Sequence, residues 1–282
     1  MTVLHSLDAL REWQQNVNWF DKKSCFVPTM GALHEGHLSL IRRASELGEV
    51  VVVSILVNPT QFNEPKDFQS YPRALGPDVD MAQNAGAHAV FAPQAEELYR
   101  GVPTAGHVDW GNLTHAFEGA HRPGHFDGVV AVVDLLFQAV KPSIAVFGEK
   151  DLQQVAVVKR LARERHPDVD IVVGELVRDP SGLALSSRNV RLDQEGLKVA
   201  LTLSRALRHV VEECAKRRPV QAALAEAGSM LESTQGLELE YLDAVNGFTF
   251  ESYAEGDAAP THVVVAAHVQ GVRLIDNATL RT

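Results

Sequence analysis

Cysteine is scarce in this sequence: Cys25 and Cys214 are the only two, and they lie far apart along 282 residues. A structural zinc site needs several Cys or His ligands close together, which this pair does not provide. Two cysteines are compatible with a reducing compartment. The chain also lacks an apolar run of about 18 residues, as a membrane-spanning helix needs, and its N-terminus lacks the apolar core of a signal peptide. We therefore expect a cytoplasmic protein with no membrane partner.

Basic residues are outnumbered by acidic ones. Lys and Arg together number 26 against 36 Asp and Glu, which gives a formal net charge of −10. Proteins that bind extended nucleic acid usually present a basic face, so we expect no nucleic-acid partner. A small anionic substrate is compatible with this charge if cations gather locally. Lys150, Arg122 and Arg188 stand near glycine-bearing turns and are the candidates.

Strand-like and helical patterns alternate through the first two thirds of the chain. Residues 50–57 form an almost uninterrupted apolar run, typical of a parallel strand covered on both faces. Further strands are expected at 25–27, 88–91, 143–147 and 171–177, and helices at 38–47, 77–85, 129–140 and 152–165. This alternation predicts an α/β fold built on a Rossmann-like, doubly wound parallel sheet.

The pattern changes after about residue 178. Helices are expected at 197–215 and 220–231, followed by strands at 237–244, 262–267 and 272–277. We therefore predict two domains, a Rossmann-like domain at 1–177 and a smaller C-terminal α+β domain at 178–282, with no internal repeat.

The most informative segment reads Pro28-Thr-Met-Gly-Ala-Leu-His-Glu-Gly-His37, and we call its residues 30–37 the histidine turn. Gly31 and Gly36 let the backbone pass close to a ligand, and the first N–H groups of the following helix face the same space. A phosphate fits there. The His-Glu-x-His spacing is one residue short of the zinc-protease pattern, which argues against such a protease. Either histidine alone could equally be a core residue, but two in a glycine-bearing turn favour a ligand.

Two other turns follow predicted strands, Asn58–Phe62 and Gly148–Asp151. Because ligands of doubly wound sheets bind beyond the carboxyl ends of the strands, we expect both turns to meet the histidine turn at one edge. A later loop, 178–189, groups Ser186, Ser187 and Arg188, whose donors suit phosphate oxygens. Its alternative interpretation is an ordinary interdomain loop with a capping serine.

Together these segments resemble the pantothenate synthetase family of the nucleotidyltransferase superfamily. The resemblance rests on five motifs in the family's order: Pro28 to His37, Val57-Asn-Pro-Thr-Gln-Phe62, Arg122-Pro-Gly-His-Phe126, Phe147-Gly-Glu-Lys-Asp-Leu-Gln-Gln154 and Leu185-Ser-Ser-Arg-Asn189. It implies a two-step ligation in which pantoate attacks the α-phosphorus of ATP and β-alanine then attacks the pantoyl adenylate. The products are pantothenate, AMP and pyrophosphate.

The resemblance also implies roles for the domains and their partners. Domain 1–177 would bind the nucleotide and pantoate, and domain 178–282 would act as a lid. Mg²⁺ would enter with ATP, held largely by phosphate oxygens, and its protein ligands are left unassigned. Asp80 and Gln83 align with an acidic segment of the family, and we assign them no role. The family further implies a homodimer built through the larger domain.

The site residues that the resemblance implies fall into three groups. The catalytic group is His34, His37, Lys150, Ser186, Ser187 and Arg188. The ATP-binding group is Met30, Gly31, Ala32, Leu33, His34, Glu35, Gly36, His37, Gly148, Glu149, Lys150, Asp151, Val177, Leu185, Ser186, Ser187 and Arg188. The pantoate-binding group is Gln61 and Gln154. We expect the histidines to stabilise charge as hydrogen-bond donors, and Lys150 to lower the repulsion between two anions.

Two further expectations concern the pantoate pocket and its closure. Phe62, Val132, Val133 and Phe147 are candidates for an apolar wall, although most suit a plain core equally well. The long segment 63–77, together with Ser186–Arg188, would shield the adenylate from water.

Two alternative functions stay open on the residues alone. A nucleotidyltransferase with a phosphate acceptor, such as pantetheine phosphate, would share the histidine turn but would not need Gln61 and Gln154. A non-catalytic nucleotide-binding module could lose Lys150.

Overall fold

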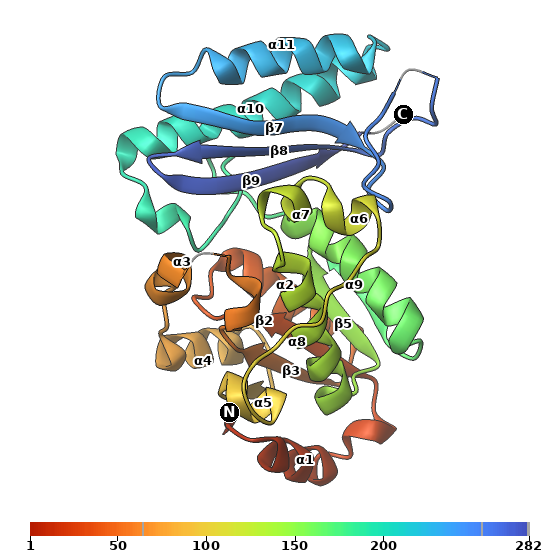
Figure 1. Cartoon of the computed structure of the whole chain (residues 1–282). Helices are drawn as coiled ribbons and strands as arrows, with labels where there is room; N and C mark the ends of the chain where they lie inside the picture. The colour runs from red at the N-terminus through yellow and green to blue at the C-terminus, as the bar shows by residue number, and fades with distance from the viewer. Residues whose placement is uncertain (64, 255, 281–282) are drawn as a thin grey trace. The chain divides into compact units, whose positions relative to one another are not determined.

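The computed structural model describes residues 1–63, 65–254 and 256–280. The chain divides into two compact units (Figure 1). Unit 1 comprises Met1–Glu149 and Gln154–Glu175, whereas unit 2 comprises Lys150–Gln153 and the chain from Leu176 onward. Lys150–Gln153, Leu176 and Val177, which the sequence assigns to the first domain, therefore group with the second unit.

Unit 1 alternates strands with helices. Its elements are β1 (Thr2–Leu4), α1 (Leu7–Asn16), η1 (Trp19–Asp21), β2 (Ser24–Thr29), α2 (Glu35–Leu47), β3 (Val50–Ile55), η2 (Pro59–Gln61), α3 (Pro65–Ser70), α4 (Leu75–Asn84), β4 (Ala89–Phe91), α5 (Ala95–Tyr99), α6 (Asn112–His115), α7 (Glu118–His121), α8 (His125–Val140), β5 (Ile144–Gly148), η3 (Glu149–Asp151), α9 (Leu152–Arg165) and β6 (Asp170–Gly174). The short helix η3 and the first residues of α9 extend into unit 2.

The strands of unit 1 form one parallel sheet in the order β1-β4-β3-β2-β5-β6. The chain moves outward from β2 through β3 to β4, and then returns to β5 on the other side of β2. The direction of winding therefore reverses between β2 and β5, which is the point where doubly wound sheets bind ligands. The α/β prediction is confirmed.

Helices cover both faces of this sheet. On one face, α2 and α4 pack Ile41, Ala44 and Ala82 against alternate residues of β2 and β3, such as Val27 and Val53. Because strand residues alternate between faces, their neighbours point to the opposite side. On that side Phe137 of α8 meets Phe147 of β5 edge to face, with ring centroids 6.4 Å apart.

Several element boundaries differ from the sequence prediction, and two of them have a local cause in the hydrogen bonding. Helix α2 begins at Glu35, before the apolar run that starts at Leu38, because His34 caps it. Strand β6 ends at Gly174, short of the predicted residue 177, because its partner β5 ends at Gly148, the residue paired with Gly174. Beyond it, the carbonyl of Val177 accepts a hydrogen bond from the N–H of Leu185.

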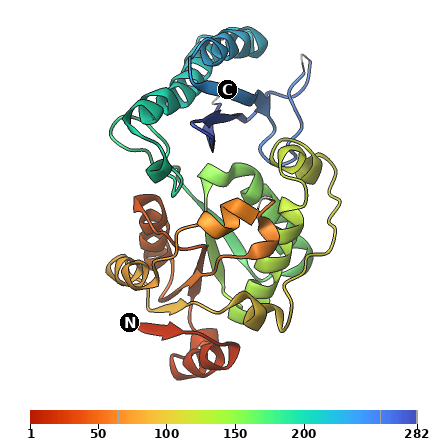
Figure 2. The same cartoon turned by 60° about the vertical axis from the view of Figure 1, so that its left-hand side comes forward.

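Unit 2 is an α+β structure. Its further elements are η4 (Asn189–Arg191), α10 (Gln194–Ala215), α11 (Val220–Glu232), β7 (Leu237–Val245), β8 (His262–Val269) and β9 (Val272–Thr279). The strands form an antiparallel sheet in the order β7-β8-β9. In Figures 1 and 2, α10 and α11 lie together on one face of this sheet.

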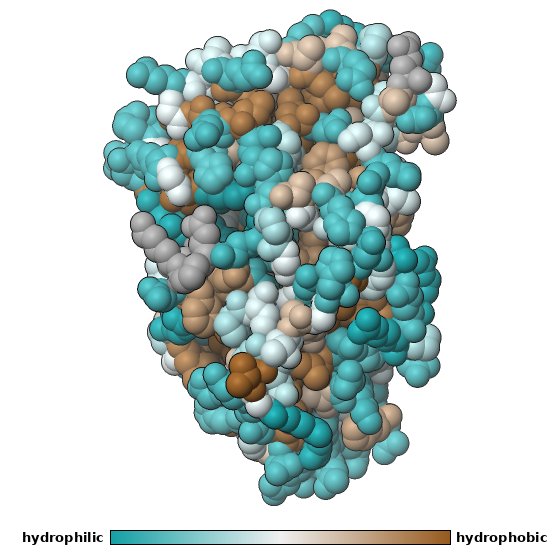
Figure 3. Space-filling view, in the orientation of Figure 1, coloured by the Kyte–Doolittle hydropathy of each residue, from teal (hydrophilic) through white to brown (hydrophobic). Residues whose placement is uncertain are grey.

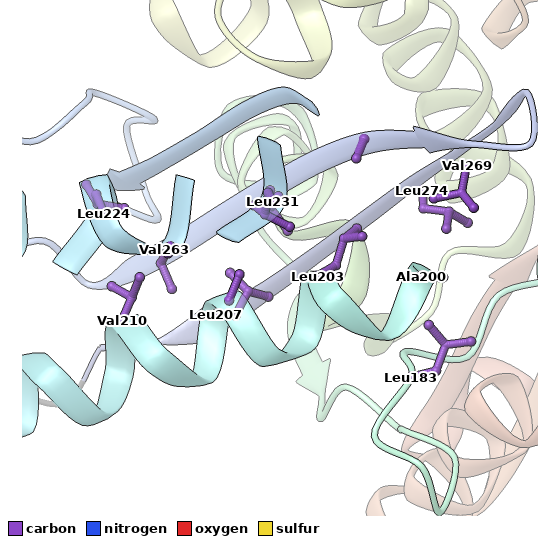
Figure 4. Close-up of a cluster of buried hydrophobic side chains, with 14 of the residues drawn as sticks. Leu183, Ala200, Leu203, Leu207, Val210, Leu224, Leu231, Val263, Val269 and Leu274 are labelled. Atoms are coloured by element: carbon purple, nitrogen blue, oxygen red, sulfur yellow. The ribbon is translucent and has the colours of Figure 1, made fainter. Parts of the chain in front are cut away.

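The core of unit 2 lies between these helices and the sheet. Leu203, Leu207 and Val210 project from α10 toward Val263 and Leu274 of the sheet (Figure 4). Each is less than a tenth exposed, so their burial stabilises the unit by about 1.5–3 kcal/mol per large side chain.

On the face seen in Figure 3, hydrophilic residues alternate with patches of hydrophobic residues. Within the described part of the chain, no helix combines the length and apolar character needed to cross a membrane.

Candidate active site

The histidine turn connects β2 to α2 at the reversal point of the sheet. His34 is the N-cap of α2: its Nδ1 accepts a hydrogen bond from the Gly36 N–H at 3.2 Å. The N–H of His34 in turn donates to Nδ1 of His37 at 3.3 Å. This is a reciprocal capping box made by two imidazoles, an unusual choice since Ser, Thr, Asp and Asn are the favoured caps.

These contacts determine where the two rings carry their protons. A backbone N–H can only donate, so each Nδ1 must be an acceptor and the ring proton must lie on Nε2. The rings are 4.1 Å apart between centroids and tilted by 43°. Both histidines of the turn are therefore neutral Nε2–H donors in this conformation. A second proton on either ring would break its capping bond.

Asp78 of α4 holds the first half of the turn. Its side chain is 1% exposed, and its two oxygens accept from the N–H groups of Ala32 and Leu33, each at 2.8 Å. Gly31 has φ +80°, and a Cβ there would come within 2.9 Å of an Asp78 oxygen. Glycine at 31 is thus required both by conformation and by the close carboxylate.

The sequence interpretation missed Asp78 and considered Asp80 and Gln83, which are both exposed. Composition does not separate these residues, but spacing could have. Asp78 lies four residues before Ala82, which is fully buried, so both share the inner face of α4. A carboxylate on an inner helix face needs donors, and the N–H groups of a nearby turn supply them.

Gln61 lies beside the histidine turn. Its side chain is 9% exposed, and its Oε1 accepts from Nδ2 of the fully buried Asn58 at 3.3 Å. The amide is thereby oriented with Nε2 toward Met30, whose Sδ is 2.8 Å away. The structure thus brings together a residue predicted for pantoate and one predicted for ATP.

Helix α8 packs against the turn that carries Gln61. A Cβ at Gly128 would lie 2.2 Å from the Thr60 carbonyl oxygen, so only glycine lets α8 approach η2 this closely. The Gly128 carbonyl accepts from Asn58 at 3.2 Å. Arg122 Nη1 lies 3.0 Å from Nε2 of His125 and donates to it, which leaves Nδ1 of His125 to donate to the Gln61 carbonyl at 2.9 Å. The motif Arg122 to Phe126 therefore positions the backbone of Gln61.

The other predicted residues of unit 1 are placed as follows. Val132, Val133 and Phe147 are 5–6% exposed, and Phe62 packs edge to face with Phe68 and Tyr71. Gln154 is half-buried on α9, and Gly148 ends β5 with Glu149 next in η3. In segment 63–77 the structure has α3 and the start of α4, while residue 64 lies outside the described residues.

Unit 2 holds the remaining predicted residues. Lys150 is half-buried in η3, Asp151 is exposed, and Val177 and Leu185–Arg188 are half-buried. The loop around them folds back on itself. Leu185 N–H donates to the Val177 carbonyl at 3.0 Å, and Arg188 N–H donates to Oγ of Ser186 at 3.2 Å. We call the segment Leu185–Arg188 the phosphate loop, because the sequence predicts that it binds phosphate. A hydrogen bond links it directly to Val177.

An ion pair between the half-buried Arg178 and the buried Asp276 stabilises the chain segment that leads into this loop. Arg178 donates to the two oxygens of Asp276 at 2.7 and 2.9 Å, and also to the Gly182 carbonyl at 3.1 Å. Burial raises the pKa of the Asp276 carboxyl, and the Arg178 guanidinium opposes that rise. The geometry is the bidentate one that arginine favours with a carboxylate.

Within the described residues, no three His, Cys, Asp or Glu side chains gather in a way that could hold a metal ion.

Comparison with known proteins places this geometry in a family. The family model described as pantoate-beta-alanine ligase matches residues 2–279. The chain belongs to the pantoate-beta-alanine ligase family. Ligation of pantoate with β-alanine to pantothenate is the function of this family, so the chain is a ligase and its chemistry is ATP-dependent.

Individual ligases of this family are similar along nearly the whole chain. A pantothenate synthetase of Cytophaga hutchinsonii is 45% identical over 89% of each chain, and one of Marinobacter nauticus is 41% identical over 99% of each. The crystal structure of pantothenate synthetase from Thermus thermophilus has a TM-score of 0.92 at 40% identity, with both chains fully covered. A Francisella tularensis pantoate-beta-alanine ligase, complexed with β-γ ATP and β-alanine, has a TM-score of 0.82 at 32% identity over 100% of this chain and 98% of that one.

Proposed function

We propose that this ligase works through a pantoyl adenylate. The carboxylate of pantoate attacks the α-phosphorus of ATP and pyrophosphate leaves. The amine of β-alanine then attacks the acyl carbon, and AMP leaves. Magnesium accompanies ATP and neutralises charge on its phosphates.

The observation that carries this proposal is the pair of backbone N–H donors on Nδ1 of His34 and His37, from which the ring protons are assigned to Nε2. A neutral imidazole with its proton on Nε2 is a hydrogen-bond donor, but it is a very poor acid. His34 and His37 therefore stabilise the charge that builds on phosphate oxygens, and they do not protonate the leaving group. Preorganised donors of this kind need no reorganisation during the reaction, because the backbone already holds their Nδ1 atoms.

The other residues of the proposal supply charge and orientation. Lys150 neutralises the repulsion between the pantoate carboxylate and the phosphate, and Ser186, Ser187 and Arg188 bind phosphate oxygens. Gln61 and Gln154 hydrogen-bond pantoate. The Gln61 amide is oriented by Asn58, and its Nε2 carries a second hydrogen besides the one directed at Met30 Sδ. Met30–His37, Gly148–Asp151, Val177 and Leu185 contact the nucleotide.

Four broader features complete the proposal. The enzyme acts in the cytoplasm as a homodimer and has no nucleic-acid partner. Segment 63–77 and the phosphate loop shield the adenylate from water, since a mixed anhydride hydrolyses readily.

Partial reactions test the proposal. With Mg²⁺, ATP and pantoate but no β-alanine, the enzyme should exchange labelled pyrophosphate into ATP, because adenylation is reversible. Omitting pantoate should abolish the exchange, and adding β-alanine should yield AMP and pantothenate. Exchange that needs β-alanine, or ADP as a product, would contradict the proposal.

A second candidate, transfer to a phosphate acceptor such as pantetheine phosphate, has no observation in its favour. The oriented amide of Gln61 suits a hydroxy acid better than a phosphate, because a phosphate calls for cations.

A further inference from the structure

Asn277 lies on β9, and at this strand the usual alternation of exposed and buried residues breaks. Asp276 is 5% exposed and its neighbour Asn277 is 4% exposed. Two successive buried polar residues on a strand require partners on both faces, because neighbouring side chains point to opposite sides. Asp276 has its partner in Arg178.

The partner of Asn277 is the backbone of Lys150. The side-chain Nδ2 of Asn277 donates to the Lys150 carbonyl at 3.1 Å, across 127 positions of the sequence. The main-chain carbonyl of Asn277 meanwhile accepts from Arg178 at 3.1 Å. Asn277 therefore contacts both the backbone of Lys150 and the side chain of Arg178, which precedes the phosphate loop in the chain.

The grouping of the chain agrees with this contact. Lys150–Gln153 belong to unit 2 although the strand before them, β5, belongs to unit 1. Lys150 and the phosphate loop therefore belong to the same compact unit. Both are linked to β9 through Asn277, Asp276 and Arg178.

We propose that Asn277 is a positioning residue for adenylation, which holds Lys150 in register with the phosphate loop. This inference rests on the proposed function, because it assumes that Lys150 acts on the phosphate. A lysine has four rotatable side-chain bonds, so a fixed backbone is the main restraint on where its ammonium can reach. Small displacements of a charged group from the reacting atoms are costly in rate.

A double-mutant cycle tests the proposal by pantoate-dependent pyrophosphate exchange. Asn277→Ala should slow exchange by about tenfold to a hundredfold. In the background of Lys150→Ala, the same change should alter exchange by less than about threefold, because the group it positions is gone. Asn246→Ala is the matched control. Asn246 is a hydrogen-bonded asparagine of the same unit that caps a turn at Phe248, and its loss should leave exchange unchanged.

The outcomes are distinguishable. Equal losses in both backgrounds would mean that Asn277 acts through stability alone, and would overturn the inference. Normal exchange in Asn277→Ala beside a slow Lys150→Ala would also overturn it, while leaving the proposed function intact. Normal exchange in Lys150→Ala would contradict the role of that lysine, and the inference with it.

A second variant keeps the proposal testable if Asn277→Ala does not fold. Asn277→Asp keeps the volume of the side chain but cannot donate to the Lys150 carbonyl, so it should show the same non-additive loss. Melting temperatures of all variants should be measured by circular dichroism. If neither variant folds, Asn277 is needed for the unit itself and the proposal fails.

Discussion

At the scale of single residues, the histidine turn depends on which nitrogen of each ring carries the proton. The backbone uses Nδ1 of both histidines, which leaves Nε2 as the donor. The same rings cap a helix and, in the proposed function, donate to phosphate, and these two roles can be separated by mutation.

His37→Asn provides that separation. Asparagine keeps an acceptor near the position of Nδ1 but has no donor at the position of Nε2. We expect adenylation to slow by on the order of 10²-fold, as when a transition-state donor is removed, with a melting temperature close to that of the parent. His37→Ala should lose both rate and stability. Single-turnover formation of the pantoyl adenylate measures the rate. His115→Ala, at an exposed histidine, is the control.

If His37→Asn slows adenylation less than about tenfold, the Nε2–H of His37 does not act in the chemical step, and its role is confined to the helix cap.

Asp78 supports the same turn from behind. Asp78→Ala leaves the N–H groups of Ala32 and Leu33 without their acceptor, and we expect a loss of about 2–4 kcal/mol in the free energy of unfolding. Asp80→Ala on the same helix should change it by less than about 0.5 kcal/mol, because Asp80 is exposed. Urea denaturation measures both. Equal effects of the two substitutions would show that the carboxylate does not hold the turn.

The two glutamines should affect pantoate and not ATP. Gln61→Ala and Gln154→Ala each remove an amide that we propose binds the acid, so we expect pantoate affinity to fall about tenfold or more. ATP affinity should change by less than about threefold. Calorimetry with each substrate measures this, and Gln138→Ala, an exposed glutamine of α8, is the control. A collapse of ATP affinity with pantoate binding intact would assign these residues to the wrong substrate.

At the scale of elements, ion pairs stabilise the C-terminal end of helix α10. Glu213 accepts from Lys216 at 2.8 Å and from Arg218 at 2.6 Å, and these bonds lower the pKa of its carboxyl from 4.5 to about 2. A carboxyl with a depressed pKa in the folded state stabilises it above its unfolded pKa, and this stabilisation is lost as the pH falls toward the folded value.

Glu213→Gln should therefore lower the melting temperature at pH 7 and have a shrinking effect as the pH falls from about 4.5 toward 2. Glu212→Gln on the exposed side of α10 is the control. Thermal melts at pH 7, 4 and 3 measure the difference. An effect of Glu213→Gln that is constant with pH would contradict an electrostatic origin.

Elements were predictable from sequence where burial alone decides them. The valine run predicts β3, observed at Val50–Ile55, because a strand covered on both faces must be apolar throughout. The helix Leu152–Arg165 was predicted with its observed bounds. Strand β1 was missed because Thr2–Leu4 is only partly buried and has no fully apolar run, unlike the equally short β4, which is buried and apolar throughout.

The site was less predictable than the fold. The motifs identify the histidine turn and Gln61, but the supporting contacts come from residues distant in sequence. Asp78 is 45 positions from Leu33, and Asn277 is 127 from Lys150. Local spacing can place Asp78 on the inner face of α4, but it does not say which distant residue is the partner in either pair. The roles of the site residues in catalysis stay predictions.

At the scale of the whole molecule, the parallel sheet supplies a reversal point between β2 and β5, and the histidine turn follows the first of these strands. Unit 2 carries Lys150 together with the phosphate loop, so the predicted ATP residues are shared between two compact units. In the proposed function, substitution occurs at one atom, the α-phosphorus of ATP, and this is its central claim.

Isotope transfer tests that claim most directly. Pantoate labelled with ¹⁸O in its carboxylate is incubated with the enzyme, Mg²⁺, ATP and β-alanine, and the products are analysed by mass spectrometry. We predict one ¹⁸O in AMP and none in pyrophosphate, because the bridging oxygen of the adenylate stays on phosphorus when the amine attacks carbon. Label in inorganic phosphate, with ADP as the nucleotide product, would mean attack at the γ-phosphorus and would contradict the account.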